Sequence, residues 1–148
     1  HMSYRGNFLD LDPTYKDPLG RPLMRMTFNW NPNDIRMTQF MKSKMEPIAQ
    51  SMNPTSMQEG FKKEGAMYDV RPYQTTHNVG GSVMGADPKT SAVNRYLQAW
   101  DKHNIFVMGA GAFPQNTQYN PTGMVGGLAY WAAHAIRTQY LSNPRPLV

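Results

Sequence analysis

One histidine has the residue type and the sequence surroundings of a proton-transfer site. His77 ends a polar, β-prone segment, residues 73–77, and two residues separate it from the double glycine Gly80-Gly81. A neutral imidazole accepts a proton near physiological pH, and adjacent glycines let another group approach the backbone closely. We therefore expect His77 to be a general base beside an open cavity. The alternative is a histidine whose ring is satisfied by a backbone carbonyl.

A second candidate lies 43 residues further along the chain, where Asn120 directly precedes Pro121. Asparagine followed by proline is typical of a helix start, with the asparagine as cap and the proline at the first helical position. A helix N-terminus carries free N–H groups and about half a positive charge, which together favour an anion. Asn120 is therefore expected to cap the helix and to offer its amide to a ligand.

The other chemical motifs are weaker. Residues 109–114, GAGAFP, resemble a dinucleotide-binding loop, but proline stands at the third glycine position and no βαβ unit follows. His103 lies in a polar turn and is expected to be solvated, and His134 is expected on a helix face. The chain has no cysteine and its 10 acidic residues are dispersed, so no metal site is predicted.

Two elements are predicted before His77. Residues 17–22, DPLGRP, are typical of a tight turn, and residues 23–30 partly alternate as a strand does, which indicates a hairpin. A helix is predicted over residues 33–52, with Pro47 expected to kink or interrupt it. Methionines at positions 37, 41 and 45 share one helical face, for which we expect core packing rather than a binding groove.

The helix after Asn120 is the clearest element and is expected to run to about residue 141. Its opening turns contain three glycines, Gly123, Gly126 and Gly127, each costing about 1 kcal/mol of helix propensity relative to alanine. Small residues at this place let another body lie against the helix backbone. A packing stripe is expected further along, at Leu128, Trp131, Ala132, Ala135 and Ile136.

Composition limits the fold and the class of partner. The 148 residues are enough for one domain with one core, and the 12 glycines and 12 prolines make a plain helical bundle unexpected. The net charge of +5 comes from scattered basic residues, so nucleic-acid binding is not expected; it would require Lys42, Lys44, Lys62 and Lys63 to share a face. His1-Met2 has the form of a cloning remnant and is left out of the site.

Three segments together resemble a known family. HNVGGSVMG (residues 77–85), NIFVMGAGAFP (residues 104–114) and NPTG (residues 120–123) are similar in order and separation to the C-terminal signature of the glucose-methanol-choline (GMC) flavoprotein oxidoreductases. Within this family, the sequences of these segments are most similar to the branch that contains the flavoprotein subunits of gluconate 2-dehydrogenase and of sorbitol and fructose dehydrogenases. The resemblance covers most of the chain from residue 17 to residue 146.

The resemblance implies an FAD-dependent dehydrogenase that oxidises a CH–OH group of a sugar, a polyol or a sugar acid. His77 matches the family's general base for the hydroxyl proton, and Asn120 matches the partner that hydrogen-bonds the same hydroxyl. Gly109 and Ala110 match the backbone that passes the FAD, and Pro121 and Thr122 match the helix start at the flavin ring. Gly109 stands where many members have an aspartate, so its contact would come from the backbone alone.

The resemblance also implies the place of this chain in a larger protein. Family members have a glycine-rich FAD-binding part that is not found in this sequence, so residues 3–148 are expected to be the C-terminal substrate-binding and catalytic portion, inactive and without bound FAD on its own. The implied fold is α+β, with an antiparallel sheet, flanking helices and a long C-terminal helix. Implied partners are the N-terminal FAD-binding domain and a cytochrome c subunit, in a periplasmic, membrane-associated setting; the isolated chain is expected to self-associate.

A different class of function stays open from the sequence. The low content of charged residues, 17%, and the methionine-rich helix are also consistent with a non-enzymatic interaction domain that docks a redox partner. A structure that brings His77 and Asn120 to one pocket favours the enzyme. A structure that places them on opposite surfaces favours the interaction domain.

Overall fold

The computed structural model describes residues 2–60, 63–71, 77–116 and 120–147. The chain divides into two compact units, which we describe separately: unit 1 comprises residues 1–9 and 75–148, and unit 2 comprises residues 10–74. The described residues contain one antiparallel sheet of two strands and two α-helices, which confirms the α+β class in its coarse form.

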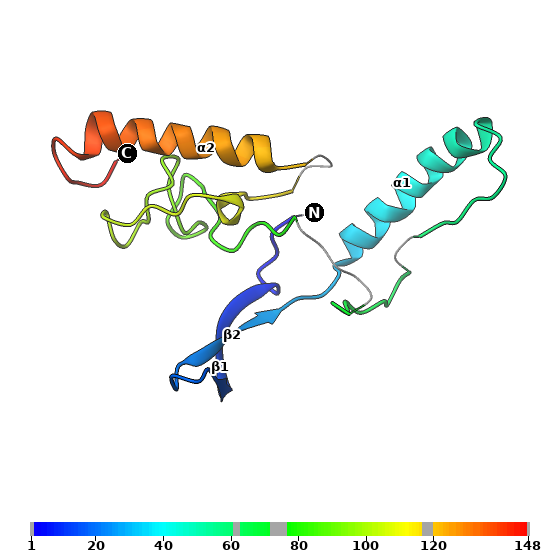
Figure 1. The fold of residues 1–148 in the computed structure, drawn as a ribbon, viewed down its shortest axis with the longest axis horizontal. Coiled ribbons are helices and arrows are strands. Elements are labelled where there is room, and N and C mark those ends of the chain that lie inside the picture. Colours follow the sequence, from blue (N-terminus) through cyan, green and yellow to red (C-terminus); the bar gives the residue numbers. More distant parts are fainter. Residues whose placement is uncertain (1, 61–62, 72–76, 117–119, 148) are drawn as a thin grey trace. The chain divides into compact units, whose positions relative to one another are not determined.

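The expected hairpin is present, formed by β1 (Phe8–Lys16) and β2 (Pro22–Thr27) (Figure 1). Asp17 closes its turn, because one carboxylate oxygen accepts the backbone N–H groups of Leu19 and Arg21, each at 2.9 Å. The Arg21 guanidinium donates to the other oxygen at 2.8 Å. These hydrogen bonds hold the pKa of Asp17 below its ordinary value, with the Arg21 backbone N–H as the largest cause.

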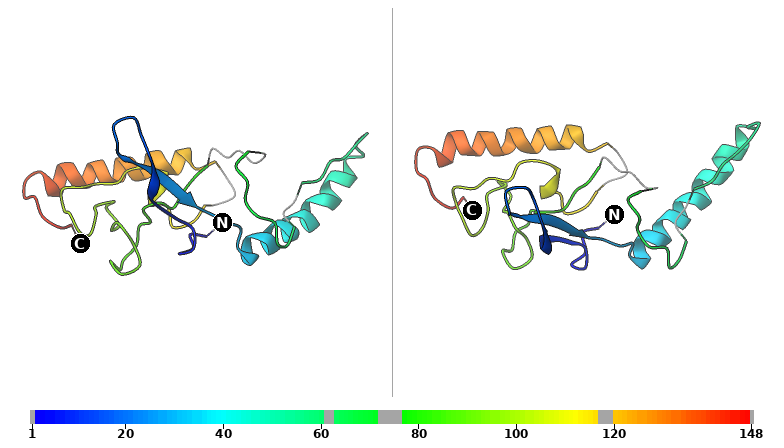
Figure 2. Two further views of the ribbon diagram at one scale, coloured as in Figure 1. Left: turned by 90° about the horizontal axis from the view of Figure 1, so that it is seen from below. Right: turned by 60° about the horizontal axis from the view of Figure 1, so that its bottom comes forward.

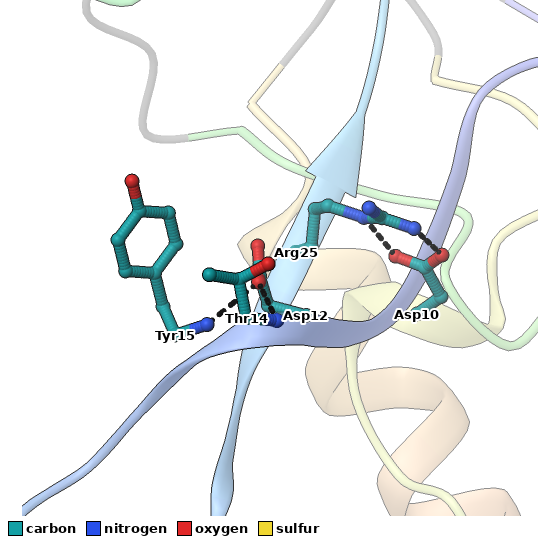
Figure 3. A network of polar contacts seen from close by, with 5 residues as sticks. All are labelled: Asp10, Asp12, Thr14, Tyr15 and Arg25. Carbon is teal, nitrogen blue, oxygen red and sulfur yellow. Dashed lines mark hydrogen bonds and ion pairs between the residues drawn. The ribbon is translucent and has the colours of Figure 1, made fainter.

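Polar contacts also join the two strands above the turn (Figure 3). The Nε of Arg25 on β2 donates to the Asp10 carboxylate on β1 at 2.8 Å, and this hydrogen bond lowers the pKa of Asp10. Asp12 accepts the backbone N–H groups of Thr14 and Tyr15, both at 2.8 Å. Both aspartates therefore hold the hairpin as carboxylates, on a surface open to water.

The predicted helix over residues 33–52 is α1 (Pro32–Ser51). Asp34 in its first turn accepts the backbone N–H of Asn31 at 3.1 Å, as a capping residue does. Pro47 lies inside the helix, which continues past it, so the expected interruption is absent. The segment after α1 returns alongside the helix (Figure 2). An ion pair joins the two, with the Lys42 Nζ 2.7 Å from a Glu59 carboxylate oxygen.

The buried core lies in unit 1. One cluster consists of Val93, Leu97, Ala112 and Ala132, with Met84, Val107 and Leu128 packed against it; a second consists of Tyr96, Ala135 and Leu147. The C-terminal helix α2 (Thr122–Ala135) contributes to both clusters and continues as a π-helical turn, Ile136–Tyr140. The helical run from residue 122 to residue 140 agrees with the predicted end near residue 141.

Two buried side-chain amides, Asn94 and Gln98, form what we call the amide clamp. Gln98 is 1% exposed; its Nε2 donates to the backbone oxygens of His103 at 2.6 Å and Arg145 at 3.0 Å, and its Oε1 accepts the Leu147 N–H at 2.6 Å. The Asn94 Nδ2 donates to the Leu147 oxygen at 2.6 Å. The amide clamp thereby fixes the C-terminal segment to a turn about fifty residues earlier in the chain.

The same amides stabilise an uncommon backbone conformation. Leu97 is fully buried and has a φ of 61°, a left-handed value that a branched side chain rarely adopts. Asn94 spans this residue, because its Oδ1 accepts the N–H groups of Tyr96 at 2.9 Å and Gln98 at 3.2 Å. Burial of Leu97 and these hydrogen bonds offset the conformational cost.

We expect Gln98→Ala to lower the free energy of unfolding by about 2–3 kcal/mol, since a buried group that loses its partner costs about 1–3 kcal/mol and three backbone groups lose theirs. Gln50→Ala on the exposed side of α1 is the matched control and is expected to change stability by less than about 0.5 kcal/mol. Urea unfolding measures both variants. Equal stability of the two would contradict the role given to the amide clamp.

Candidate functional site

His77 begins the described part of an extended segment and is exposed, and residues 72–76 before it lie outside the described residues. Asn116 donates its Nδ2 hydrogen to the His77 backbone oxygen at 3.3 Å, so the histidine backbone is held by the segment that leads to α2. Neither His103 nor His134 is buried; His103 Nδ1 lies 3.2 Å from the Tyr140 hydroxyl. His77 is thus presented to solvent from an anchored backbone.

The segment after His77 pairs with the second predicted segment, residues 109–112. The backbone N–H groups of Gly80, Ser82 and Met84 donate in turn to the oxygens of Ala110 at 3.3 Å, Gly111 at 2.8 Å and Ala112 at 2.8 Å. Residues 110–112 form a short 3-10 turn, and its three successive carbonyl groups accept alternate N–H groups of residues 80–84. Two segments that the sequence analysis singled out therefore lie side by side.

The double glycine is approached closely, as expected, by other residues of the same unit. Gly80 has a φ of 87°, and a Cβ there would lie 2.4 Å from the Ser3 Oγ and 3.5 Å from the Phe113 oxygen. A Cβ on Gly81 would meet the Leu9 side chain at 3.4 Å. The close approach of Ser3 and the left-handed φ explain the glycine at position 80, whereas the distance at Gly81 is an ordinary van der Waals contact that leaves room for a Cβ.

Gly109 is different, because the space beside it is open. Its φ of 130° is accessible to glycine and rare for other residues, and among the described residues no atom beyond its chain neighbours lies within 4 Å of where a Cβ would be. Both neighbouring carbonyl groups are engaged within the chain: the Gly109 oxygen accepts the Ala112 N–H at 3.2 Å, and the Ala110 oxygen accepts the Gly80 N–H at 3.3 Å. Gly109 thus leaves space for a ligand on the side where a Cβ would be, while its carbonyl is used in the short turn.

The start of α2 is shifted relative to the prediction. The helix begins at Thr122, with Pro121 in the cap position, and no side chain makes a cap hydrogen bond. The expected capping role of Asn120 is therefore wrong, because proline rather than asparagine precedes the first helical residue. Pro121 is buried, whereas Asn120 and Thr122 are exposed. In the part of the chain that the structure describes, the Asn120 amide is not used as a cap and no side chain caps the first turn of α2.

The glycines of α2 leave its backbone bare. At Gly123, Gly126 and Gly127, no atom of the described residues other than chain neighbours and the helix's own backbone lies within 4 Å of the position that a Cβ would take. The helix is held at its other half, where the Trp131 Nε1 donates to the Arg95 oxygen at 3.0 Å and its ring stacks on Tyr96 at 6.0 Å between centroids. This packing agrees with the interpretation that an anchored helix tolerates the three glycines.

One core cluster joins all three predicted segments. Met84 comes from the His77 segment, Ala112 from the segment after Gly109, and Ala132 with Leu128 from α2, and all four contact the same buried group. Within the described ranges, no three His, Asp or Glu side chains gather closely enough to hold a metal ion. The segments that carry His77, Gly109 and Asn120 therefore rest on a shared apolar base.

Sequence reasoning missed Asn94 and Gln98, on which this base depends. Both are polar residues in VNRYLQAW (residues 93–100), between side chains that are buried. Their spacing of four residues and their buried neighbours are the signal that could have identified a structural amide pair. Their partners at residues 145 and 147 are too distant in sequence for a local pattern to reveal, and the nearer partner is the backbone oxygen of His103, five residues after Gln98, which no side-chain type marks.

Comparisons with known proteins show the family to which this sequence is similar. The family model "GMC oxidoreductase" matches residues 3–129. The gluconate 2-dehydrogenase flavoprotein of Pantoea cypripedii is 62% identical over the whole chain, which corresponds to 24% of that relative. The 2-methyl-1,2-propanediol dehydrogenase of Mycolicibacterium austroafricanum is 29% identical over 90% of the chain and 23% of the relative.

A further relative is the fructose dehydrogenase large subunit of Gluconobacter japonicus, 28% identical over 88% of this chain and 22% of that subunit. The chain thus spans about a quarter of the length of the curated relatives that it matches.

We expect Gly80→Ala to destabilise the chain by at least about 1–2 kcal/mol, the usual cost of a left-handed conformation for a residue with a Cβ, in addition to the contact with Ser3. Gly123→Ala is the matched control: its position is helical and open, so it is expected to stabilise the chain by up to about 1 kcal/mol. Urea unfolding of both variants tests this.

A second substitution separates the two causes at Gly80. Ser3→Ala in the Gly80→Ala background removes the Oγ that a new Cβ would meet and is expected to restore part of the lost stability, the rest being backbone strain. Wild-type stability of Gly80→Ala would show that the close approach of Ser3 is wrong.

Proposed function

The chain belongs to the GMC oxidoreductase family, and we propose that it is the C-terminal catalytic portion of an FAD-dependent dehydrogenase that oxidises a CH–OH group of a sugar, a polyol or a sugar acid. The observation that carries the proposal is the shared core beneath the segments of His77, Gly109 and α2. The relatives named as gluconate and fructose dehydrogenases support the substrate class, with gluconate-like acids favoured by the 62% identity.

The residues present fit an extended anionic cofactor such as FAD. Among the described residues, no atom beyond the chain neighbours lies within 4 Å of where a Cβ on Gly109 would be, and the first turn of α2 has no side-chain cap and no acidic residue. Helix N–H groups of this kind stabilise negative charge. We propose that Gly109 and Ala110 line the passage of the cofactor and that Pro121 and Thr122 lie at its ring. Bound FAD would supply the acceptor for the hydride.

Two side chains of this chain are proposed to act on the substrate. His77, exposed on its anchored segment, accepts the proton of the substrate hydroxyl as the C–H bond breaks. Its ring thereby becomes an imidazolium, which later releases the proton to solvent. Asn120 lies at the mouth of α2 with an amide that makes no cap hydrogen bond, and it orients the same hydroxyl. Proton removal by a positioned base contributes about 10²–10⁴-fold in rate.

The remaining parts of the assembly are proposals from the relatives. The chain covers about a quarter of these proteins, so we propose that a separate portion of the same polypeptide binds the FAD. One relative is named a large subunit and another a flavoprotein, which supports a multi-subunit enzyme; we propose a cytochrome c subunit as electron acceptor and a periplasmic, membrane-associated location. In the described residues, neither helix is long and apolar enough to cross a bilayer.

The central test is His77→Ala in the longer flavoprotein that contains this sequence. We expect flavin reduction by substrate to slow by about 10²–10⁴-fold, with FAD still bound, because the base is lost and the fold is not. His134→Ala on an exposed face of α2 is the control and is expected to keep the wild-type rate. Stopped-flow flavin absorbance measures both, and near-normal reduction in His77→Ala would refute the assignment.

The isolated chain of 148 residues gives an independent test of its place in the larger protein. It contains the proposed helix start and Gly109 but no glycine-rich nucleotide-binding loop, so we expect it to remain colourless after incubation with FAD and gel filtration. Absorbance at the flavin bands of the protein peak is the measurement. Retention of one FAD per chain would show that the FAD-binding site is complete in these residues.

A further inference from the structure

Asn116, in the segment between Gly109 and α2, contacts the backbone of His77. Its Nδ2 donates to the His77 backbone oxygen at 3.3 Å. The Oδ1 of the same amide is buried, and the residue as a whole is half-buried. A carbonyl oxygen only accepts hydrogen bonds, so the NH2 end of the amide must face His77. This hydrogen bond uses the histidine backbone and neither ring nitrogen, which leaves it compatible with proton transfer at the ring.

The segment that carries Asn116 is fixed within unit 1. Phe113, three residues earlier, is 8% exposed, and its N–H donates to the Ala110 oxygen at 3.1 Å. Ala112, next to Phe113, is fully buried in the cluster with Val93 and Leu97. A side chain that projects from an anchored backbone restrains the group to which it donates. The Asn116 amide can therefore hold His77 in place.

Asn116 supplies the second of two attachment points for residues 77–80. The first is the Gly80 N–H, which donates to the Ala110 oxygen at 3.3 Å, and the second is the His77 oxygen, held by Asn116. Gly80 has a left-handed φ of 87° and no Cβ, so a chain attached there alone could rotate about its dihedral angles. The second attachment point opposes that rotation and fixes the direction in which the His77 side chain leaves the backbone.

We propose that Asn116 is a positioning residue for His77, which holds the imidazole within reach of the substrate hydroxyl. This inference rests on the proposed function, in which His77 is the general base. A base must come within about 2.6–3.2 Å of the atom whose proton it removes, and a misplacement of about 1 Å can cost about 100-fold in rate. Asn116 also stands four positions before Asn120, so its hydrogen bond joins His77 to the segment that leads to the proposed partner.

A positioning role and a purely structural role predict different patterns of rate. If Asn116 acts through His77, its loss slows the reaction only while the imidazole is present. If Asn116 supports the fold in general, its loss slows the reaction by the same factor with and without the imidazole. A double-mutant cycle over the two positions separates these cases, because it measures the coupling between them.

The first measurement is flavin reduction by substrate in the longer flavoprotein that contains this sequence. We expect Asn116→Ala to slow reduction at saturating substrate about tenfold and to change KM by less than about twofold, with FAD still bound. In the His77→Ala background we expect the same substitution to change the rate by less than about twofold. No slowing in the wild-type background, or equal slowing in both backgrounds, would overturn the positioning role.

An isosteric substitution tests the donor itself. Asn116→Asp keeps the shape of the side chain but places an oxygen opposite the His77 oxygen, so we expect reduction to slow at least as much as in Asn116→Ala. Gln115→Glu is the matched control, because it adds the same charge at the exposed neighbouring position and is expected to stay within about twofold of the wild-type rate. Equal slowing in the two variants would assign the effect to charge and overturn the proposal.

Amide hydrogen exchange, followed by mass spectrometry of the same flavoprotein, tests the attachment without using activity. We expect a peptide that includes residues 77–82 to exchange about three- to tenfold faster in Asn116→Ala, because one hydrogen bond fewer opposes local opening. A peptide over residues 93–100 is the internal control and is expected to exchange at the wild-type rate. Unchanged exchange at residues 77–82 would show that Asn116 does not hold His77.

The two proposals fail in different ways. If Asn116→Ala changes neither exchange nor flavin reduction while His77→Ala still slows reduction, the positioning role is wrong and the proposed function stands. If His77→Ala reduces flavin normally, the catalytic assignment is wrong and the positioning role is lost with it. Faster exchange in Asn116→Ala would then assign the hydrogen bond to the fold alone.

Discussion

Unit 1 depends on the hydrogen bonds of the amide clamp. Asn94 and Gln98 connect a tight turn to the last described residues of the chain, and Leu147, which they hold, packs with Tyr96 and Ala135. The same tight turn contains Leu97, which is fully buried in the cluster with Val93, Ala112 and Ala132. Because buried amides demand partners in defined directions, they fix the geometry more narrowly than apolar contacts alone. The place of α2 over the core follows from this constraint.

Local patterns were sufficient for the elements and insufficient for the contacts. The hairpin turn at Asp17 and the bounds of α1 follow from residues within a few positions of each other. The first residue of α2 was missed because Pro121 takes the cap position ahead of Thr122. The amide clamp was missed because most of its partners lie about fifty residues away. Core packing was expected for Met37, Met41 and Met45, but these side chains are exposed; an amphipathic pattern does not reveal whether an apolar helix face is covered.

The candidate site was predicted in the same uneven way. The three segments were identified by their residue types, and the structure adds the backbone pairing of Gly80, Ser82 and Met84 with residues 110–112. The glycine pair predicts that another group approaches the backbone closely, and at Gly80 that group is the Ser3 side chain of the same unit. Gly109 and Gly80 look alike in sequence, but one faces open space and the other a side chain. Only tertiary contacts distinguish them.

The two halves of α2 explain how a helix can be both anchored and open. Its second half carries the packing, with Trp131 bonded to the Arg95 oxygen and Ala132 and Ala135 buried. That packing offsets the propensity lost at three glycines in the first half, where no atom from another described segment lies within 4 Å of where a Cβ would be. A helix stabilised evenly along its length would need side chains over its first turns, and these would fill the space beside its N–H groups. Stability at one end is therefore the condition for an accessible backbone at the other.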